Sequence, residues 1–342
     1  MQLTLSGGVV RGDERARERF YDSRGYGRVD DGGLELAPVE AAHLLYRGDV
    51  DTVRDTATDR DLDFRGLLTS DAVSEIDVLV YKDLRDRGFY LSPAREGWVD
   101  EPERADFVVY PRGKGPWDDE VAYRIQALSE RTDVPAAALG ESVLAVVDEE
   151  SSITYLETDR PEIAGSSETA LPSDVPADLL GDRVLAWDPP TDLYHEGFYG
   201  QPLDEDSETP LQLSLVEAAA LAETGVLSVT GGARAIVERG REVEGERFDR
   251  RLAVYRALRE RGVVPKTGYK FGADFRTYAD VENVDNLGHS ELLVRVLSRG
   301  YAFGPRELAL DVRLAHGVRK RMVFALVDGQ DIEWVSVGRL TP

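Results

Sequence analysis

The sequence contains no cysteine, and this absence limits the chemistry that the chain can carry out. It excludes disulfides, thiolate metal sites and cysteine nucleophiles. Long apolar runs are also missing, since no stretch approaches the roughly 18–20 apolar residues of a membrane span. The first residues lack the basic and then apolar segments of a signal peptide. From these absences we expect a cytoplasmic protein with no membrane association.

Basic residues are few compared with acidic ones. The 342 residues include 41 Lys and Arg against 65 Asp and Glu, a formal net charge of −24, and lysine is scarce beside arginine. The acidic residues are spread along the whole chain, which is typical of a protein kept in solution at high salt. We therefore interpret the chain as halophilic. At molar salt the Debye length is only ~3 Å, so the overall negative charge does not exclude a nucleic acid partner.

The sequence contains one unit twice. The segment VYKDLRDRG at 80–88 returns as VYRALRERG at 254–262. Four further pairs of segments align in the same order, and they begin at residues 25 and 198, 39 and 216, 105 and 273, and 144 and 324. The separations stay close to half of the chain, which indicates a tandem duplication.

The order of the predicted elements indicates an α/β fold, or a mixed α+β fold, in each copy. Leu252, Tyr255 and Leu258 recur at helical spacing before Gly262, Pro305 is well placed to begin another helix, and residues 321–338 read as a hairpin. Residues 161–179, rich in Ser, Pro and Ala, read as the linker between the copies. We expect four parts: an N-terminal subdomain (1–75), a non-catalytic nuclease-like subdomain (76–165), the linker with the second N-terminal subdomain (166–248), and a catalytic nuclease domain (249–342).

The two copies differ in their titratable residues. A tyrosine persists in both, as Tyr110 and Tyr278. His289 falls opposite an acidic residue between positions 118 and 120, and Lys320 falls opposite Gly140. The scaffold is therefore repeated, whereas the histidine and the lysine belong to the second copy alone.

Tyr278, His289 and Lys320 form a set that suits the cleavage of RNA by its own 2′-hydroxyl. Histidine titrates near neutral pH and donates a proton to a leaving group. Tyrosine takes part in proton transfer, although its reference pKa of about 10 makes it a poor base unless perturbed. Lysine stabilises negative charge on a phosphoryl transition state. No group of Asp, Glu and His with metal-ligand spacing stands beside them, so we expect neither metal nor cofactor.

Structural interpretations compete with this one. A tyrosine at a strand end is often part of the core, a histidine in a turn is often structural, and His316 is a rival for His289. Residues 249–276 carry eight basic against three acidic residues, and residues 313–321 carry four basic residues and no acidic one. Such basic islands suggest a nucleic acid partner, but they also serve as partners for an acidic surface.

Three segments of the second copy, VYRALRERGVVPKTGYKFGADFRTY, HSELLVRV and VRLAHGVRKRMVFALVD, closely resemble the archaeal tRNA-splicing (tRNA-intron) endonucleases. The tandem layout is similar to the branch in which a catalytic copy follows a degenerate one. The resemblance implies that Tyr278 is the base, His289 the acid and Lys320 the stabilising cation. It also implies that Arg313 and, less securely matched, Arg339 clamp a flipped-out base of the substrate.

The resemblance also implies a substrate and an assembly. The family cuts a bulge-helix-bulge in precursor tRNA, without metal, and leaves 2′,3′-cyclic phosphate and 5′-hydroxyl ends. One triad per chain and two cuts per substrate imply a homodimer, with the acidic turn of Asp148, Glu149 and Glu150 docking in a basic pocket of the partner chain. Two alternatives stay open: a noncatalytic RNA-binding or assembly subunit, and a metal-dependent nuclease that uses Asp274.

Overall fold

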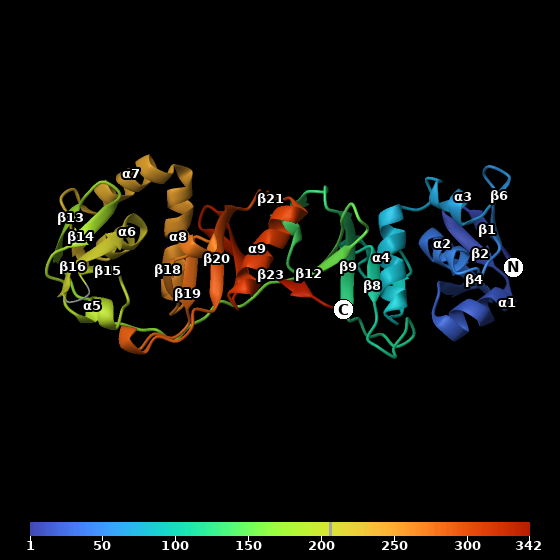
Figure 1. Cartoon of the computed structure of the whole chain (residues 1–342), viewed down its shortest axis with the longest axis horizontal. Coiled ribbons are helices and arrows are strands. Elements are labelled where there is room, and N and C mark those ends of the chain that lie inside the picture. The colour runs from blue at the N-terminus through green and yellow to red at the C-terminus, as the bar shows by residue number, and fades with distance from the viewer. Residues whose placement is uncertain (205–206) are drawn as a thin grey trace.

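Four subdomains follow one another along an elongated molecule (Figure 1). The computed structural model describes residues 1–204 and 207–342. An N-terminal subdomain lies at each end, and the two nuclease-like subdomains meet in the middle. The mixed α/β architecture predicted from the sequence is confirmed. No helix in the described part of the chain is long and apolar enough to cross a membrane.

The first N-terminal subdomain is a six-stranded sheet covered by a short helix, α2 (Pro38–Tyr46). The buried Glu40 carboxylate fixes the start of α2, because it accepts hydrogen bonds from the backbone N–H groups of Ala37 (2.9 Å) and Gly27 (2.7 Å). The strands run in the order β3 (Arg28–Asp30), β4 (Gly33–Leu36), β2 (Val9–Gly12), β1 (Gln2–Ser6), β5 (Thr52–Asp55) and β6 (Arg60–Leu62).

The second N-terminal subdomain repeats this plan with a five-stranded sheet and helix α6 (Leu215–Glu223). Its strands run in the order β15 (Gln201–Asp204), β16 (Ser207–Ser214), β14 (Arg183–Ala186), β13 (Val175–Leu179) and β17 (Leu227–Ser228). The expected linker at 161–179 extends too far, because its last five residues form β13. Val175 and Ala177 alternate with exposed neighbours and are buried, which makes 175–179 a strand.

Each nuclease-like subdomain opens with a helix of the repeated motif, α4 (Glu75–Asp86) in the first copy and α8 (Glu246–Glu260) in the second. The strands that follow combine into one ten-stranded sheet. Its order is β18 (Val264–Thr267), β19 (Phe275–Tyr278), β20 (Leu292–Ser298), β22 (Arg321–Asp328), β23 (Asp331–Leu340), β12 (Ile153–Asp159), β11 (Val143–Val147), β9 (Tyr123–Ser129), β8 (Phe107–Val109) and β7 (Leu91–Pro93). The predicted helix from Pro305 and the predicted hairpin near 321–338 are both present, as α9 (Pro305–Gly317) and β22–β23.

The two copies meet through equivalent strands. β12 of the first copy pairs antiparallel with β23 of the second, from Tyr155 opposite Leu340 to Asp159 opposite Ser336. The short strands β10 (Val134–Pro135) and β21 (Ala302–Phe303) pair in the same antiparallel sense. Side chains of both copies then form one core beneath α9, so the halves are two sides of a single folded unit.

A buried arginine joins each N-terminal subdomain to its nuclease-like neighbour. In the second copy the Arg259 guanidinium lies 3.7 Å from the Tyr199 ring centroid and donates to the Gly197 carbonyl (2.8 Å). In the first copy Arg85 lies 3.9 Å from the Tyr26 ring centroid and donates to the Arg24 carbonyl. Because cation–π contacts strengthen when desolvated, this repeated junction fixes the angle between the subdomains.

Candidate active site

The three expected catalytic residues lie at the ends of three neighbouring strands. Tyr278 ends β19, His289 precedes β20, and Lys320 precedes β22. Thr277 pairs with Leu292 across β19 and β20, and Leu292 pairs with Arg321 across β20 and β22. Each expected residue is therefore close to this row of paired residues at one end of the sheet.

Strand alternation places the tyrosine and the lysine on the same face. Leu293 of β20 and its partner Met322 of β22 belong to the core beneath α9, and Arg276 of β19 lies opposite Leu293. Because side chains alternate along a strand, Tyr278 shares the α9 face with Arg276. Lys320, two residues before Met322, is expected on the same face.

A cavity of about 840 Å³ opens at the C-terminal end of α9. His289, Lys320 and Arg339 line it together with His316 and Arg319. The structure therefore gathers three of the expected site residues around one hollow. His316, the rival histidine, lines the same hollow and is exposed.

Two expected residues lie outside this cavity. Tyr278 is one strand further along and is 7% exposed, packed with Phe198, Val264 and Val281. Its hydroxyl has no hydrogen-bond partner among the described residues and is not among the buried unpaired atoms, so it keeps some contact with solvent. Arg313 is exposed on α9 and does not line the cavity.

The backbone around Lys320 holds the lysine in place. Helix α9 ends at Gly317, and the Lys320 N–H returns to the Ala315 carbonyl (2.9 Å) while Arg319 takes a left-handed φ of 56°. The Lys320 ammonium donates to the Ser290 carbonyl, one residue from His289. Partial burial, and then the positive charge of Arg276, lower the pKa of Lys320 below its usual value.

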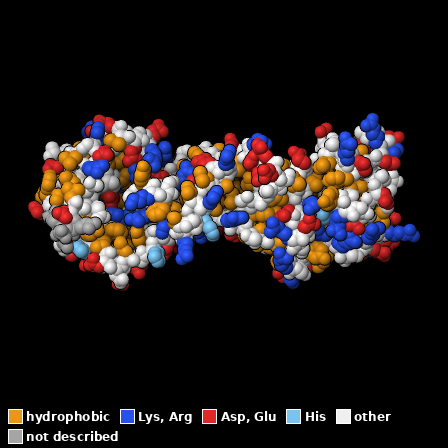
Figure 2. Space-filling model, in the orientation of Figure 1, with side chains coloured by type: hydrophobic (Ala, Val, Ile, Leu, Met, Phe, Trp, Pro, Cys, Tyr) orange, Lys and Arg blue, Asp and Glu red, His pale blue; other side chains and the backbone are white. Residues whose placement is uncertain are grey.

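Most cations at and beside the cavity are free of acidic partners in the described chain, whereas Arg321, which also lines it, pairs with Asp159 (2.9 Å). No ion pair within 4.0 Å joins Arg313, Arg319, Lys320 or Arg339 to any carboxylate of residues 1–204 or 207–342, although ion pairs are common elsewhere on this acidic chain. Figure 2 shows Lys, Arg and His side chains together on the visible face below β20 and the lower end of α9. An unpaired cluster of this kind attracts a polyanion.

The first copy keeps the fold of this region but has neither the histidine nor the lysine. The Tyr110 hydroxyl donates to the Ser92 hydroxyl (2.9 Å), and the small cavity beside it, about 290 Å³, is lined by Asp119 and Glu120. Gly140, opposite Lys320 in the alignment, has a φ of 123°, and Arg160 fills the space where a side chain would start. Carboxylates outnumber basic groups around the small cavity, where Asp100, Asp119 and Glu120 stand with Arg124.

The acidic turn lies between β11 and β12, on the surface of the first copy. Asp148, Glu149 and Glu150 are all exposed. The Asp148 carboxylate shapes the turn by accepting from the N–H groups of Glu150 and Ser152 (2.9 Å each). Glu149 forms an ion pair with Arg131, and neither Asp148 nor Glu150 has a basic partner within the described residues.

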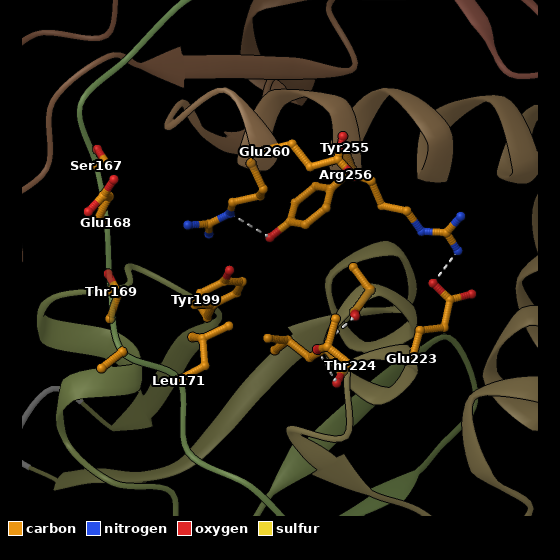
Figure 3. Close-up of a pocket in the computed structure, with 14 residues that line it drawn as sticks. Ser167, Glu168, Thr169, Leu171, Tyr199, Glu223, Thr224, Tyr255, Arg256 and Glu260 are labelled. Atoms are coloured by element: carbon orange, nitrogen blue, oxygen red, sulfur yellow. Dashed lines mark hydrogen bonds and ion pairs between the residues drawn. The ribbon is translucent and has the colours of Figure 1, made fainter.

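A second large cavity, about 780 Å³, lies between residues 167–171, α6 and α8 (Figure 3). Tyr199 and Tyr255 face it, and the ion pair of Arg256 with Glu223 closes one side. None of the expected site residues lines this cavity. Among the described residues no group of three or more His, Asp or Glu side chains is arranged to hold a metal ion.

In the sequence, Arg276 is one member of the basic island at residues 249–276. The register of β19 against β20 is what places it on the α9 face, and that register is not visible in the sequence. The only signal in the sequence was its position two residues before Tyr278 on an expected strand.

Comparison with known proteins gives matches over most of the chain. The model of the tRNA intron endonuclease catalytic C-terminal domain matches residues 248–334, and that of the N-terminal domain matches residues 1–68 and 175–239. Proteins named tRNA-splicing endonuclease are similar over their full length: 66% identical in Haloarcula marismortui and 62% in Natronomonas pharaonis, each with 100% of both chains covered. One from Methanosarcina mazei is 38% identical, with 99% of both chains covered.

Proposed function

The chain belongs to the tRNA intron endonuclease family, and on that basis we propose that it excises introns from precursor tRNA. The observation that carries the proposal is the cavity lined by His289 and Lys320 in the copy that matches the catalytic domain. Lys320, Arg319 and Arg339 of this cavity have no acidic partner among the described residues. The smaller cavity of the first copy is lined by neither histidine nor lysine and supports the same division of roles. We expect the reaction to take place in the cytoplasm.

The proposed reaction is an intramolecular transesterification, which makes the enzyme a tRNA-intron lyase. Tyr278 accepts the proton of the 2′-hydroxyl at the cleavage site, and that oxygen attacks the adjacent phosphorus. The bond from phosphorus to the 5′-oxygen breaks, and His289 donates a proton to the leaving oxygen. Lys320 stabilises the charge on the pentavalent phosphorane. The products are a 2′,3′-cyclic phosphate and a 5′-hydroxyl, and the three side chains supply the catalysis without a metal.

The geometry of the side chains supports these roles. His289 is exposed at the rim of the cavity, where a leaving oxygen can reach it. Lys320 is held by the Ser290 carbonyl close to that histidine. Tyr278 offers a hydroxyl that keeps some contact with solvent on an otherwise buried ring, so its position is rigid.

The proposed substrate contains a bulge-helix-bulge with two scissile bonds. One chain has one complete set of catalytic residues, so we infer that two chains act together as a homodimer. The exposed turn of Asp148, Glu149 and Glu150 then docks in a basic pocket of the partner chain. Arg339, at the rim of the cavity, and Arg313, on α9, stack on a flipped-out base of the bulge.

End-group analysis of the cleaved RNA tests the proposal. Purified protein in molar KCl and excess EDTA is mixed with a bulge-helix-bulge RNA, and the product ends are identified. We expect cyclic phosphate and 5′-hydroxyl ends. A 3′-hydroxyl end, or a requirement for added metal, contradicts the mechanism, and the absence of cleavage favours a noncatalytic RNA-binding subunit.

Two matched tyrosine variants separate the copies. Tyr278→Phe is expected to lower the single-turnover rate by about 10²-fold or more, because the proton acceptor is lost. Tyr110→Phe removes only the hydrogen bond to Ser92 in the first copy, and we expect it to cleave at the wild-type rate. Equal loss in both variants would show that the tyrosines serve the fold and not the chemistry.

A further inference from the structure

Arg276 occupies the same face of the sheet as the catalytic groups. It lies on β19 two residues before Tyr278, and its guanidinium carbon is 5.7 Å from the Tyr278 ring centroid. Across the sheet it is opposite Leu293, which belongs to the core beneath α9. Arg276 is therefore directed toward the side of the sheet on which Lys320 stands.

The Arg276 guanidinium has no protein partner among the described residues. Its Nε is buried without a hydrogen-bond acceptor, and no carboxylate lies within ion-pairing distance of the group. Two acidic residues near Arg276 are already engaged, since Asp274 binds Arg247 and Arg251, and Glu217 binds Lys266. The exposed Glu291, which lines the cavity with Lys320, forms no ion pair with Arg276. A half-buried cation without a partner is unfavourable for the folded chain alone, so its retention points to an external anion.

A second cation stands close to the first. Arg276 is the charged group that contributes to the lowered pKa of Lys320, after partial burial. Two like charges held near one another repel each other. A bound phosphate relieves this repulsion by pairing with both cations.

The first copy offers a natural comparison. By the alignment of residues 105–110 with 273–278, the position of Arg276 corresponds to Val108, which is 2% exposed. The tyrosine that follows is kept in both copies, whereas the charge is lost in the first copy along with the histidine and the lysine. Arg276 therefore accompanies the proposed chemistry and not the scaffold.

We propose that the Arg276 guanidinium binds a non-bridging oxygen of an RNA phosphate next to the scissile one, and so positions the strand against Tyr278 and Lys320. This inference rests on the proposed function. Arg276 also lines a cleft of about 350 Å³ with Lys266 and Arg183, and the acidic turn of a partner chain is the rival anion there. The shared face with Tyr278 favours the RNA phosphate.

The test pairs protein variants with RNAs that lack a single charge. Arg276→Gln, Arg276→Lys and wild type are compared on bulge-helix-bulge RNAs, each with one neutral methylphosphonate at a phosphate flanking a cut. Both the dissociation constant and the single-turnover rate are measured at one salt concentration. Arg65→Gln, an exposed arginine of α3 (Phe64–Leu68) without an ion pair in the described chain, is the control.

We expect Arg276→Gln to lower the single-turnover rate by about 10- to 100-fold, Arg276→Lys to recover part of it, and Arg65→Gln to match the wild type. At one flanking phosphate the neutral substitution should weaken wild-type binding and leave Arg276→Gln binding unchanged. The proposal would be overturned if, at every phosphate tested, the loss of binding caused by the neutral substitution adds to the loss caused by Arg276→Gln. Loss of the dimer in Arg276→Gln, with RNA binding per dimer intact, would instead assign the residue to the acidic turn.

The binding and cleavage measurements distinguish failure of the proposed function from failure of the inference about Arg276. If wild-type protein binds the RNA without cutting it, the nuclease function fails, and the binding comparison still reports on the phosphate contact. If cleavage proceeds but no flanking phosphate depends on Arg276, only the inference about this residue fails.

Discussion

Lys320 shows how a single ammonium is prepared for phosphate. Its nitrogen is anchored to the Ser290 carbonyl, and the left-handed Arg319 turns the chain so that Lys320 leaves α9 and enters β22. Burial and Arg276 lower the pKa of Lys320, so the ammonium loses its proton at a lower pH than that of a surface lysine.

We predict that Lys320→Gln lowers the cleavage rate by about 10²- to 10³-fold. In the wild type the rate should fall as pH rises through the lowered pKa of the lysine, because the deprotonated amine cannot stabilise the phosphorane. Lys320→Arg, which stays charged, should be slower near neutral pH but should not show that fall. Single-turnover rates between about pH 7 and pH 10, corrected for uncatalysed hydrolysis, check this. An alkaline fall of the same size in Lys320→Arg would assign the titration to another group.

Two buried residues of the first copy respond to pH in opposite senses. Burial raises the pKa of Glu40 to about 7 and lowers the pKa of His43 to about 4. The corresponding glutamate of the second copy, Glu217, has Lys266 as a partner, and there Ala220 takes the place of the histidine. The first copy therefore buries a glutamate without a lysine, and the Tyr26 hydroxyl contacts the neutral imidazole instead (3.0 Å).

The sign of each contribution to stability follows from these shifts. The folded state binds the Glu40 proton more tightly than the unfolded state does. The stability that Glu40 contributes to the fold is therefore lost between about pH 4.5 and pH 7 as pH rises. His43 binds its proton less tightly when folded, so its contribution is gained between about pH 4 and pH 6.5 as pH rises.

We predict opposite slopes for two variants measured against wild type. The free energy of unfolding of His43→Ala, relative to wild type, should fall by up to about 3 kcal/mol from pH 4 to pH 6.5, and that of Glu40→Gln should rise by a similar amount over its own range. Urea unfolding in constant molar salt checks this, because the remaining carboxylates cancel in the difference. Parallel slopes in the two variants would contradict the assigned shifts.

At the scale of the element, the turn of the hairpin β11–β12 carries three acidic residues, whereas the turn of the equivalent hairpin β22–β23 carries two, Asp328 and Asp331. Its turn is ordered by Asp148, whose carboxylate accepts two backbone N–H groups. We predict that the triple variant Asp148→Asn, Glu149→Gln and Glu150→Gln dissociates the proposed homodimer and leaves the fold intact, because asparagine keeps the acceptor. Light scattering in molar KCl measures the mass.

The matched control is Asp328→Asn with Asp331→Asn, in the β22–β23 turn. This pair removes acidic charge from an equivalent position, and the mass should stay that of the dimer. A monomer in both variants would point to a general effect of charge, and a dimer in both would remove the acidic turn from the interface.

Local elements were predictable from the sequence, whereas their partners were not. The helix from Pro305 and the hairpin after it follow from spacing within a few residues. The pairing of β12 with β23 joins residues far apart in the chain, and nothing in either strand specifies the other as its neighbour. The face on which Arg276 lies depends on that kind of register, which explains why the sequence does not show that Arg276 lies near Lys320.

At the scale of the whole molecule, one sheet and one shared core connect the copies. We expect the nuclease-like subdomains of both copies to unfold together, because neither retains its share of the core without the other. The net charge of −24 opposes this compact state when salt is low. Calorimetry across a KCl series should show the transition temperature rising with salt, as the Debye length shortens from ~30 Å at 0.01 M to ~3 Å at 1 M. A transition temperature independent of KCl would contradict the halophilic interpretation.

The pairing of β12 with β23 also limits how large an assembly can grow. Each copy uses its exposed strand edge on the other, so the backbone groups at the centre of the sheet have no capacity left for a third strand. The free edges that remain, β18 and β7, each contain a proline, Pro265 and Pro93, which removes a donor from the edge. Further association through this sheet therefore depends on side chains that match at particular places, and not on an open row of backbone donors and acceptors.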